Sequence, residues 1–453
     1  MDPLVQRLAE YYRCPEEYCS FALLGALSAK PGYFRFGHDT SCYGRYIGRQ
    51  PASRAEDEQF DAFRDTEIKN GTVYLPFDPA EVVDNLRLET YAPDWRGHFS
   101  TFALAPLYYF LRPLLPVGIR KHIQEFHFRG WNDLTFPRWP VDCSVDNLLS
   151  QLLGLSMRAC RSDRIPFVWF WPQGARCCAI MTHDVETEVG RRFCSELMDM
   201  DDAAGVKASF QVIPEQRYTV TPGFLATIRD RGFEIVVHDL NHDGHLYRNR
   251  KQFLRRAAKI NSYATRYGAE GFRAATLYRK QLWYDALKFS YDMSIPNVAH
   301  LDPQRGGCCT VMPFFIDKIL ELPVTTTQDY TLFNILNDRS IDLWKRQMDT
   351  IGQKHGLISF IVHPDYIVKP RHRSIYETLL AYLGNMRENS GLWIATPGEV
   401  NRWWRQRSEM RLSKAGNGWR IEGRGSERAC LAYATLEGEE LKYELPATPD
   451  TAL

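Results

Sequence analysis

From about Arg176 onward, short apolar runs alternate with longer segments of helical periodicity. The runs expected to be strands are Cys178–Met181, Lys207–Ile213, Phe233–His238, Leu357–His363 and Leu392–Ala395. The segments expected to be helices are Val189–Ala204, Phe224–Arg231, Arg250–Tyr267, Gln281–Phe289, Ile341–Lys354 and Ser374–Met386. Strands that alternate with helices predict βαβ units around a parallel sheet or barrel, an α/β fold. Folds of this class place their functional side chains where the strands end.

The rest of the chain lacks this alternation. Residues 1–145 are rich in Tyr, Phe, Arg and Pro and show few helical or strand periods, which indicates an irregular, aromatic-rich N-terminal region. Residues 406–453 contain short alternating runs and turn signals at residues 416–418 and 437–438, which predict a small antiparallel β unit. The expected domains are therefore 1–145, the α/β part 146–405 and the β unit 406–453.

The charge balance, the cysteines and the first residues indicate which partners and which cellular compartment to expect. The 453 residues carry 56 Lys plus Arg against 55 Asp plus Glu, and this balance argues against binding to nucleic acid. The eleven cysteines include two adjacent pairs and no CxxC motif, which favours reduced thiols in a reducing compartment. The first ten residues have neither the basic nor the apolar part of a signal peptide, so we expect a cytoplasmic protein.

One apolar stretch, Phe102–Ile119, is about long enough to cross a bilayer. It contains Arg112 and three prolines, which a spanning helix accommodates only with help from neighbouring helices. Two interpretations stay open: a buried or surface-packed helix pair, or a patch for peripheral membrane contact. Arg120, Lys121 and Arg129 would suit anionic head groups in the second case. The sequence carries no indication of the oligomeric state.

Two motifs follow strands and carry side chains that bind metals or move protons. Asp184 and Glu186 come directly after the strand that ends at Met181, so one carboxylate could bind a cation while the other takes a proton. His238 and His242 follow the next strand but one and are four residues apart. If the chain is helical there, both imidazoles lie on one helix face. Two histidines and a carboxylate are a common ligand set for catalytic zinc.

Two further candidates also stand at strand ends. Arg273 would need a carboxylate partner if it is buried, and a catalytic carboxylate is the natural one. His363 ends an apolar strand and precedes Pro364, which suits a general acid because its ordinary pKa lies near neutral pH. Asp292 is a candidate for the carboxylate that orients His363. Read alone, each residue could equally be structural.

In this order, the motifs resemble those of the polysaccharide deacetylase (NodB-homology) family of carbohydrate esterases. The resemblance covers about residues 170–405. It implies a distorted (β/α) barrel, a divalent metal that is most often Zn²⁺, and removal of acetyl groups from N-acetylated sugars. Some members of this family cleave other non-peptide C–N bonds.

The resemblance also implies roles for individual residues. Asp184 matches the catalytic base, Arg273 the arginine that tethers the base, and His363 the general acid. His238 and His242 match the two histidine ligands of the metal.

The sequence departs from the usual family pattern in two places. Val185 follows Asp184 where a second aspartate is commoner, so Glu186 is the best third ligand. Arg273 is followed by Ala274–Ala275–Thr276 without the usual proline, so the resemblance does not predict the groove wall that this proline helps to build.

The expected activity is a metal-dependent hydrolysis of an N-acetyl amide on a glycan or a glycan precursor, such as a nucleotide-linked or lipid-linked sugar. One alternative is a hydrolase of a small non-sugar amide. Four aromatic residues could line a sugar cleft and tilt slightly towards sugar: Tyr278, Trp283, Tyr291 and Tyr366. Another alternative is a glycan-binding protein that has lost activity, but base, acid, arginine and ligands are all present together.

Overall fold

A computed structural model describes residues 3–92, 130–416 and 418–445. Contacts between residues group the chain into two compact units. Unit 1 consists of Met1–Tyr91, Cys143–Cys177 and Arg402–Leu453, and unit 2 of Ala92–Asp142 and Cys178–Asn401. The three domains expected from the sequence stay a prediction. The apolar stretch Phe102–Ile119 lies outside the described residues.

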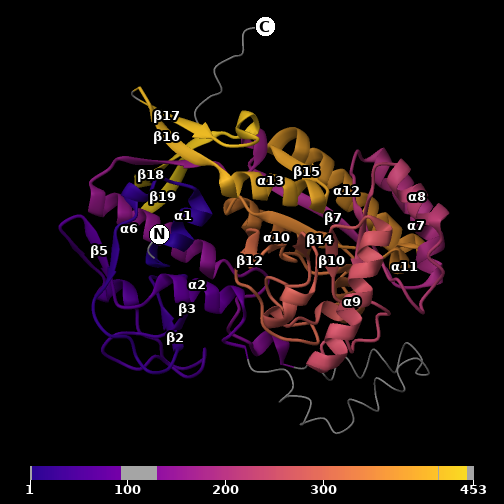
Figure 1. Ribbon diagram of the computed structural model, residues 1–453, viewed down its shortest axis with the longest axis horizontal. Helices are drawn as coiled ribbons and strands as arrows, with labels where there is room; N and C mark the ends of the chain where they lie inside the picture. The colour runs from indigo at the N-terminus through magenta and orange to yellow at the C-terminus, as the bar shows by residue number, and fades with distance from the viewer. Residues whose placement is uncertain (1–2, 93–129, 417, 446–453) are drawn as a thin grey trace. The chain divides into compact units, whose positions relative to one another are not determined.

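Unit 2 contains the alternating strands and helices (Figure 1). Its strands are β7 (Cys177–Val185), β8 (Ser209–Val212), β9 (Glu234–His238), β10 (Gly271–Arg273), β11 (Tyr291–Asp292), β12 (Phe314–Ile316), β13 (Ile319–Glu321), β14 (Leu357–Ile361) and β15 (Leu392–Ala395). Its α-helices are α7 (Glu188–Ala203), α8 (Pro222–Asp230), α9 (Arg250–Tyr267), α10 (Asp342–Gln353), α11 (Pro364–Ile367) and α12 (Pro370–Ser390). The five strands predicted from the apolar runs are all present.

One predicted helix is wrong. Gln281–Ala286 forms only a 3-10 helix, and the chain leaves it before residue 289. The Asn261 side chain, on α9, donates to the carbonyl oxygen of Ala286 and accepts from the amide of Lys288. These two backbone groups are therefore bonded to a side chain and are not used to continue a helix.

The strands of unit 2 form one sheet in the order β12-β13-β11-β10-β9-β8-β7-β14, and β15 also pairs with β7. Along this order, pairing is parallel from β13 through β14, and β12 runs antiparallel to β13. All nine residues of β7 and all five of β14 are buried, as expected for central parallel strands. Among the described residues the order has two free ends, so a closed (β/α) barrel is not confirmed. The fold is α/β.

The parallel pairing brings the carboxyl ends of β7, β9, β10 and β14 to one edge of the sheet. Thr187 caps α7 directly after β7, because its hydroxyl accepts from the amides of Val189 and Gly190. The chain therefore turns from strand to helix within a few residues of Asp184 and Glu186. This short turn fixes the backbone positions from which both side chains extend.

Unit 1 joins segments that are far apart in the chain. Its α-helices are α1 (Pro3–Tyr12), α2 (Pro79–Arg87) and α6 (Ser144–Cys160), and α13 (Pro397–Glu409) carries the chain into it from unit 2. Its strands are β1 (Phe21–Leu23), β2 (Gly32–Arg35), β3 (Ser41–Gly44), β4 (Glu67–Lys69), β5 (Thr72–Leu75), β6 (Arg164–Val168), β16 (Arg411–Ala415), β17 (Gly418–Glu422), β18 (Leu431–Glu437) and β19 (Glu440–Glu444). The C-terminal strands are antiparallel as predicted, but β18 also pairs with β6.

Two further sequence expectations concern the cysteines and the membrane. All eleven cysteines lie within the described residues, and the structure pairs none of them in a disulfide. In the part of the chain that the structure describes, the helices are too short or too polar to cross a membrane.

Candidate active site

The end of β7 divides its side chains between two faces of the sheet, because successive residues of a strand point in opposite directions. Thr182 and Asp184 face Arg273 of β10, which donates to both of them. His183 bonds elsewhere: its Nε2 lies 2.9 Å from Asp201 of α7, and its Nδ1 donates to the carbonyl oxygen of Val362. His183 is therefore part of the buried packing between β7 and α7, away from Asp184.

Asp184 and Arg273 form a buried ion pair, as the sequence indicated. The Nη1 atom of Arg273 lies 2.7 Å from Oδ1 of Asp184, and the Arg273 side chain is fully buried. Nε of Arg273 donates to the carbonyl oxygen of Met293, which holds the guanidinium in place. Burial alone would raise the pKa of Asp184, but the nearby Arg273, His238 and His363 together outweigh burial and lower that pKa. Asp184 therefore stays ionised, with Oδ2 left to take a proton.

The two histidines of the second motif come together without a helix. His238 is the last residue of β9, and residues 239–248 form bends and turns. Asp239 and His242 have positive φ angles of 54° and 55°, which a right-handed helix excludes. The carbonyl oxygen of His242 accepts from Arg217, which helps to hold this turn. The imidazole centres still lie 4.8 Å apart.

Glu186, His238 and His242 form a group that could hold a metal ion. One ligand atom from each lies within 4.8 Å of the others. Nε2 of His242 is 3.0 Å from Oε1 of Glu186, yet Nε2 of both histidines is buried and makes no hydrogen bond. Buried polar atoms without a partner are costly, so their convergence on one point fits a divalent cation.

The protonation of His238 suits a ligand. Its Nδ1 donates to the carbonyl oxygen of Arg273 at 3.1 Å, which leaves the lone pair on Nε2. Burial lowers the pKa of His238 to about 4, although the Asp184 charge opposes this. His238 is therefore neutral at ordinary pH.

His363 faces the same group from the turn between β14 and α11. Its Nε2 lies 3.7 Å from Oε1 of Glu186, while its Nδ1 lies 2.6 Å from Oδ1 of Asp329. The amide of His363 also donates to Asp329. The carboxylate that orients His363 is thus Asp329. The sequence had suggested Asp292 for this role. No local sequence pattern marks Asp329, which lies 34 residues before His363.

Asp292 has a different place. It lies on β11 and accepts from the hydroxyls of Tyr284 and Ser294, and β13 places Glu321 beside it. Burial raises the pKa of both Asp292 and Glu321, which lie opposite each other on neighbouring strands. Asp292 is occupied by this pair and is not bonded to His363.

The four aromatic residues do not form one cleft. Tyr291 is buried and donates to Glu234, and Trp283 packs against Tyr247 and Phe253. Tyr278 is buried as well. Tyr366 lies against a candidate residue, because its ring centre is 5.2 Å from that of His363. Tyr330, which the sequence did not single out, packs against Tyr366 at 5.6 Å.

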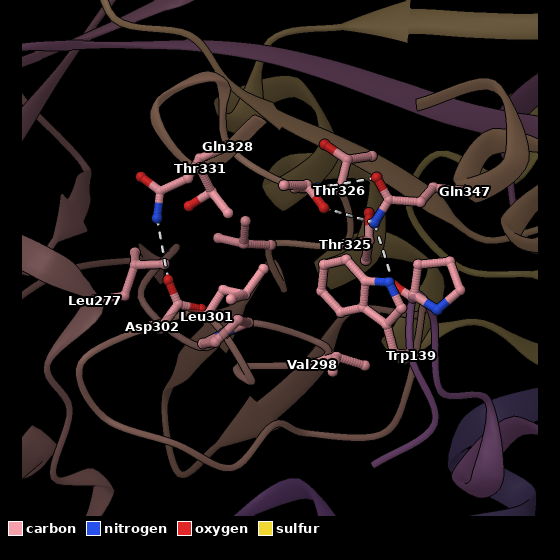
Figure 2. Close-up of a pocket in the computed structure, with 14 residues that line it drawn as sticks. Trp139, Leu277, Val298, Leu301, Asp302, Thr325, Thr326, Gln328, Thr331 and Gln347 are labelled. Carbon is pink, nitrogen blue, oxygen red and sulfur yellow. Dashed lines mark hydrogen bonds between the residues drawn. The ribbon is translucent and has the colours of Figure 1, made fainter. Parts of the chain in front are cut away.

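A pocket in unit 2 is lined by none of the candidate residues (Figure 2). Its walls include Trp139, Thr326 and Gln347, and the Gln328 side chain donates to Asp302 across it. Its cavity volume is about 30 Å³, and none of Asp184, Glu186, His238, His242 and His363 reaches it. We therefore do not assign the substrate to this pocket.

No protein-family model matches this sequence, and no curated protein matches it. A protein from Mycobacterium smegmatis assigned to the polysaccharide deacetylases is 16% identical, with a TM-score of 0.44 over 55% of this chain and 98% of its own. The allantoinase PuuE is 14% identical, with a TM-score of 0.41 over 52% and 92%. The peptidoglycan deacetylase PdaC from Bacillus subtilis is 12% identical, with a TM-score of 0.35 over 52% and 95%. The solved structures to which this chain is similar thus include proteins named as polysaccharide or peptidoglycan deacetylases and an allantoinase.

Proposed function

We propose that this protein is a metal-dependent hydrolase that removes an N-acetyl group from a glycan or a glycan precursor. The observation that supports it best is the convergence of three kinds of group: candidate metal ligands, a candidate base and a candidate acid. The buried, unbonded Nε2 atoms of His238 and His242 meet near a carboxylate oxygen of Glu186. Oδ2 of Asp184 lies 3.7 Å from Nε2 of His238, and Nε2 of His363 is 3.7 Å from Glu186.

The proposed reaction adds water to the amide carbon and releases acetate and an amine. A divalent cation on Glu186, His238 and His242, most often Zn²⁺ in such ligand sets, would supply Lewis-acid chemistry when bound. Asp184 takes the proton of the attacking water on Oδ2, since Oδ1 is bonded to Arg273. Arg273 keeps Asp184 ionised until then. His363 gives a proton from Nε2 to the departing nitrogen.

The pKa of His363 fits the role of an acid. Burial alone would lower this pKa, but the charge and hydrogen bond of Asp329, together with the charges of Glu186 and Asp184, outweigh burial and raise it to about 10. His363 is therefore protonated at neutral pH, whereas Asp184 is ionised. A base and an acid with pKa values pushed apart by their surroundings are the pair that hydrolysis of an amide needs.

The first test measures metal content by elemental analysis in the wild type and in the His238→Ala/His242→Ala double variant. We expect about one equivalent of a divalent metal in the wild type and none in the variant. N-acetylated sugars and nucleotide-linked sugars are then screened for acetate release, with the metal removed and restored. A wild type that binds no metal even after reconstitution would refute the proposal. Bound metal without turnover on any amide would favour the glycan-binding alternative.

The same screen separates the two enzymatic readings. Turnover of small non-sugar amides without turnover of sugar amides would favour the alternative hydrolase. The cytoplasmic location and a membrane-associated or lipid-linked substrate rest on sequence alone and stay predictions.

Replacement of Asp329 by Asn is expected to shift the pH dependence of kcat/KM. A general acid must be protonated, so activity is lost as pH rises through its pKa. Without the Asp329 charge the pKa of His363 falls, and the alkaline loss of activity should move to lower pH. The measurement is a full pH profile for the metal-loaded proteins. Asp292→Asn is the matched control, because it removes a buried carboxylate that does not contact His363, and an equal shift in both variants would contradict the assignment.

A further inference from the structure

One carboxylate near the site has no role in the proposed reaction. Asp365 lies two residues after His363, at the start of α11. Its Oδ2 accepts from the backbone amide of Glu186 at 3.1 Å, and its Oδ1 accepts a hydrogen bond from the Thr187 hydroxyl. Asp365 therefore reaches from the loop after β14 to the loop after β7 and bonds two consecutive residues there.

The bonds of Asp365 fall on the part of the chain that carries a candidate ligand. The Glu186 side chain is 26% exposed, and its carboxylate must reach His242 from a turn between β7 and α7. A glutamate has three side-chain torsions, so its carboxylate is placed only as well as its backbone is held. Thr187 also caps α7, so one carboxylate holds both the ligand residue and the helix start.

Gly190 shows how closely Asp365 fits against α7. A Cβ atom at this position would lie 2.6 Å from Cγ of Asp365, far inside ordinary contact distance. The φ angle of Gly190 is not positive, so its backbone conformation does not require glycine. Its lack of a side chain instead allows Asp365 to approach closely. Any larger residue there would push the Asp365 carboxylate off its two donors.

We propose that Asp365 is a positioning residue that sets the backbone of Glu186 and thereby the geometry of the metal site. This inference rests on the proposed function, because it treats Glu186 as a ligand. Asp365 also links two segments with different roles. The segment that carries the acid His363 holds the segment that carries the ligand Glu186. The effect of Asp365 should therefore appear as metal affinity, independent of turnover.

The test measures the affinity for Zn²⁺ by competition with a chromophoric chelator, together with thermal unfolding of the metal-free proteins. Asp365→Ala is expected to weaken Zn²⁺ binding about 10- to 100-fold, as loss of a residue that supports a ligand does. Asp365→Asn should weaken it less, since its oxygen can accept from the Glu186 amide while its nitrogen donates to the Thr187 hydroxyl. Gly190→Ala should also weaken it, although alanine favours a helix more than glycine.

Asp338→Ala is the matched control. Asp338 accepts from the amide and the hydroxyl of Ser340, so its removal also deletes one bond to an amide and one to a hydroxyl. The affinity of the Asp338→Ala variant for Zn²⁺ should equal that of the wild type. The inference is overturned if Asp365→Ala binds Zn²⁺ as tightly as the wild type. It is also overturned if Asp365→Ala and Asp338→Ala lose affinity equally. If the wild type itself binds no Zn²⁺, the proposed function fails instead, so the two failures are distinct.

Discussion

Asp184→Asn is expected to lower the turnover of the metal-loaded protein by about 10²- to 10⁴-fold while the metal stays bound. Asparagine keeps the shape of the side chain and an oxygen that can accept from Arg273, but it cannot take a proton from water. The candidate ligands Glu186, His238 and His242 are unchanged, so their affinity for metal should persist. The loss should therefore fall on kcat.

The same substitution has a structural cost that must be measured beside it. Arg273 is fully buried, and Asp184 is its bonded counter-charge. Removal of one partner of a buried pair destabilises a protein by about 3–5 kcal/mol. Metal content, thermal unfolding and turnover are therefore measured on the same preparation. A folded, metal-loaded Asp184→Asn protein that retains wild-type turnover would refute the assignment of the base.

Strand ends were the part of the site that the sequence could reveal. Asp184, His238 and His363 each follow or end an apolar run, and parallel pairing brings such positions to one edge of the sheet. The contact between Asp184 and Arg273 could be expected because a buried arginine needs a carboxylate. These inferences need only strand periodicity and the chemistry of the side chains.

Other features depend on contacts that no local pattern encodes. Asp329 reaches His363 from a segment 34 residues earlier, and nothing around it differs from an ordinary polar loop. The spacing of His238 and His242 is that of a helix face, yet positive φ angles at Asp239 and His242 produce the approach through a loop. In unit 1, the pairing of β18 with β6 spans more than two hundred residues and was equally invisible.

His363→Ala is expected to lower kcat on N-acetylated amines by about 10²- to 10⁴-fold. An amine anion is a very poor leaving group, so the departing nitrogen must receive a proton as the bond breaks. Nδ1 of His363 is bonded to Asp329, which leaves Nε2 as the atom that faces the candidate ligands and delivers the proton. The donors of the metal site are untouched by this substitution, so metal content should equal that of the wild type.

The comparison that isolates this role uses two substrates with different leaving groups. An aryl acetate releases a phenolate, which departs without a proton, so His363→Ala should retain most of the wild-type rate on it. The ratio of the two rates, amide over aryl ester, should then fall by nearly the full factor lost on the amide. Asp184→Asn provides the contrast, because both substrates need the attacking water and both rates should fall together. An equal loss on both substrates in His363→Ala would show that this histidine shapes the site and is not its acid.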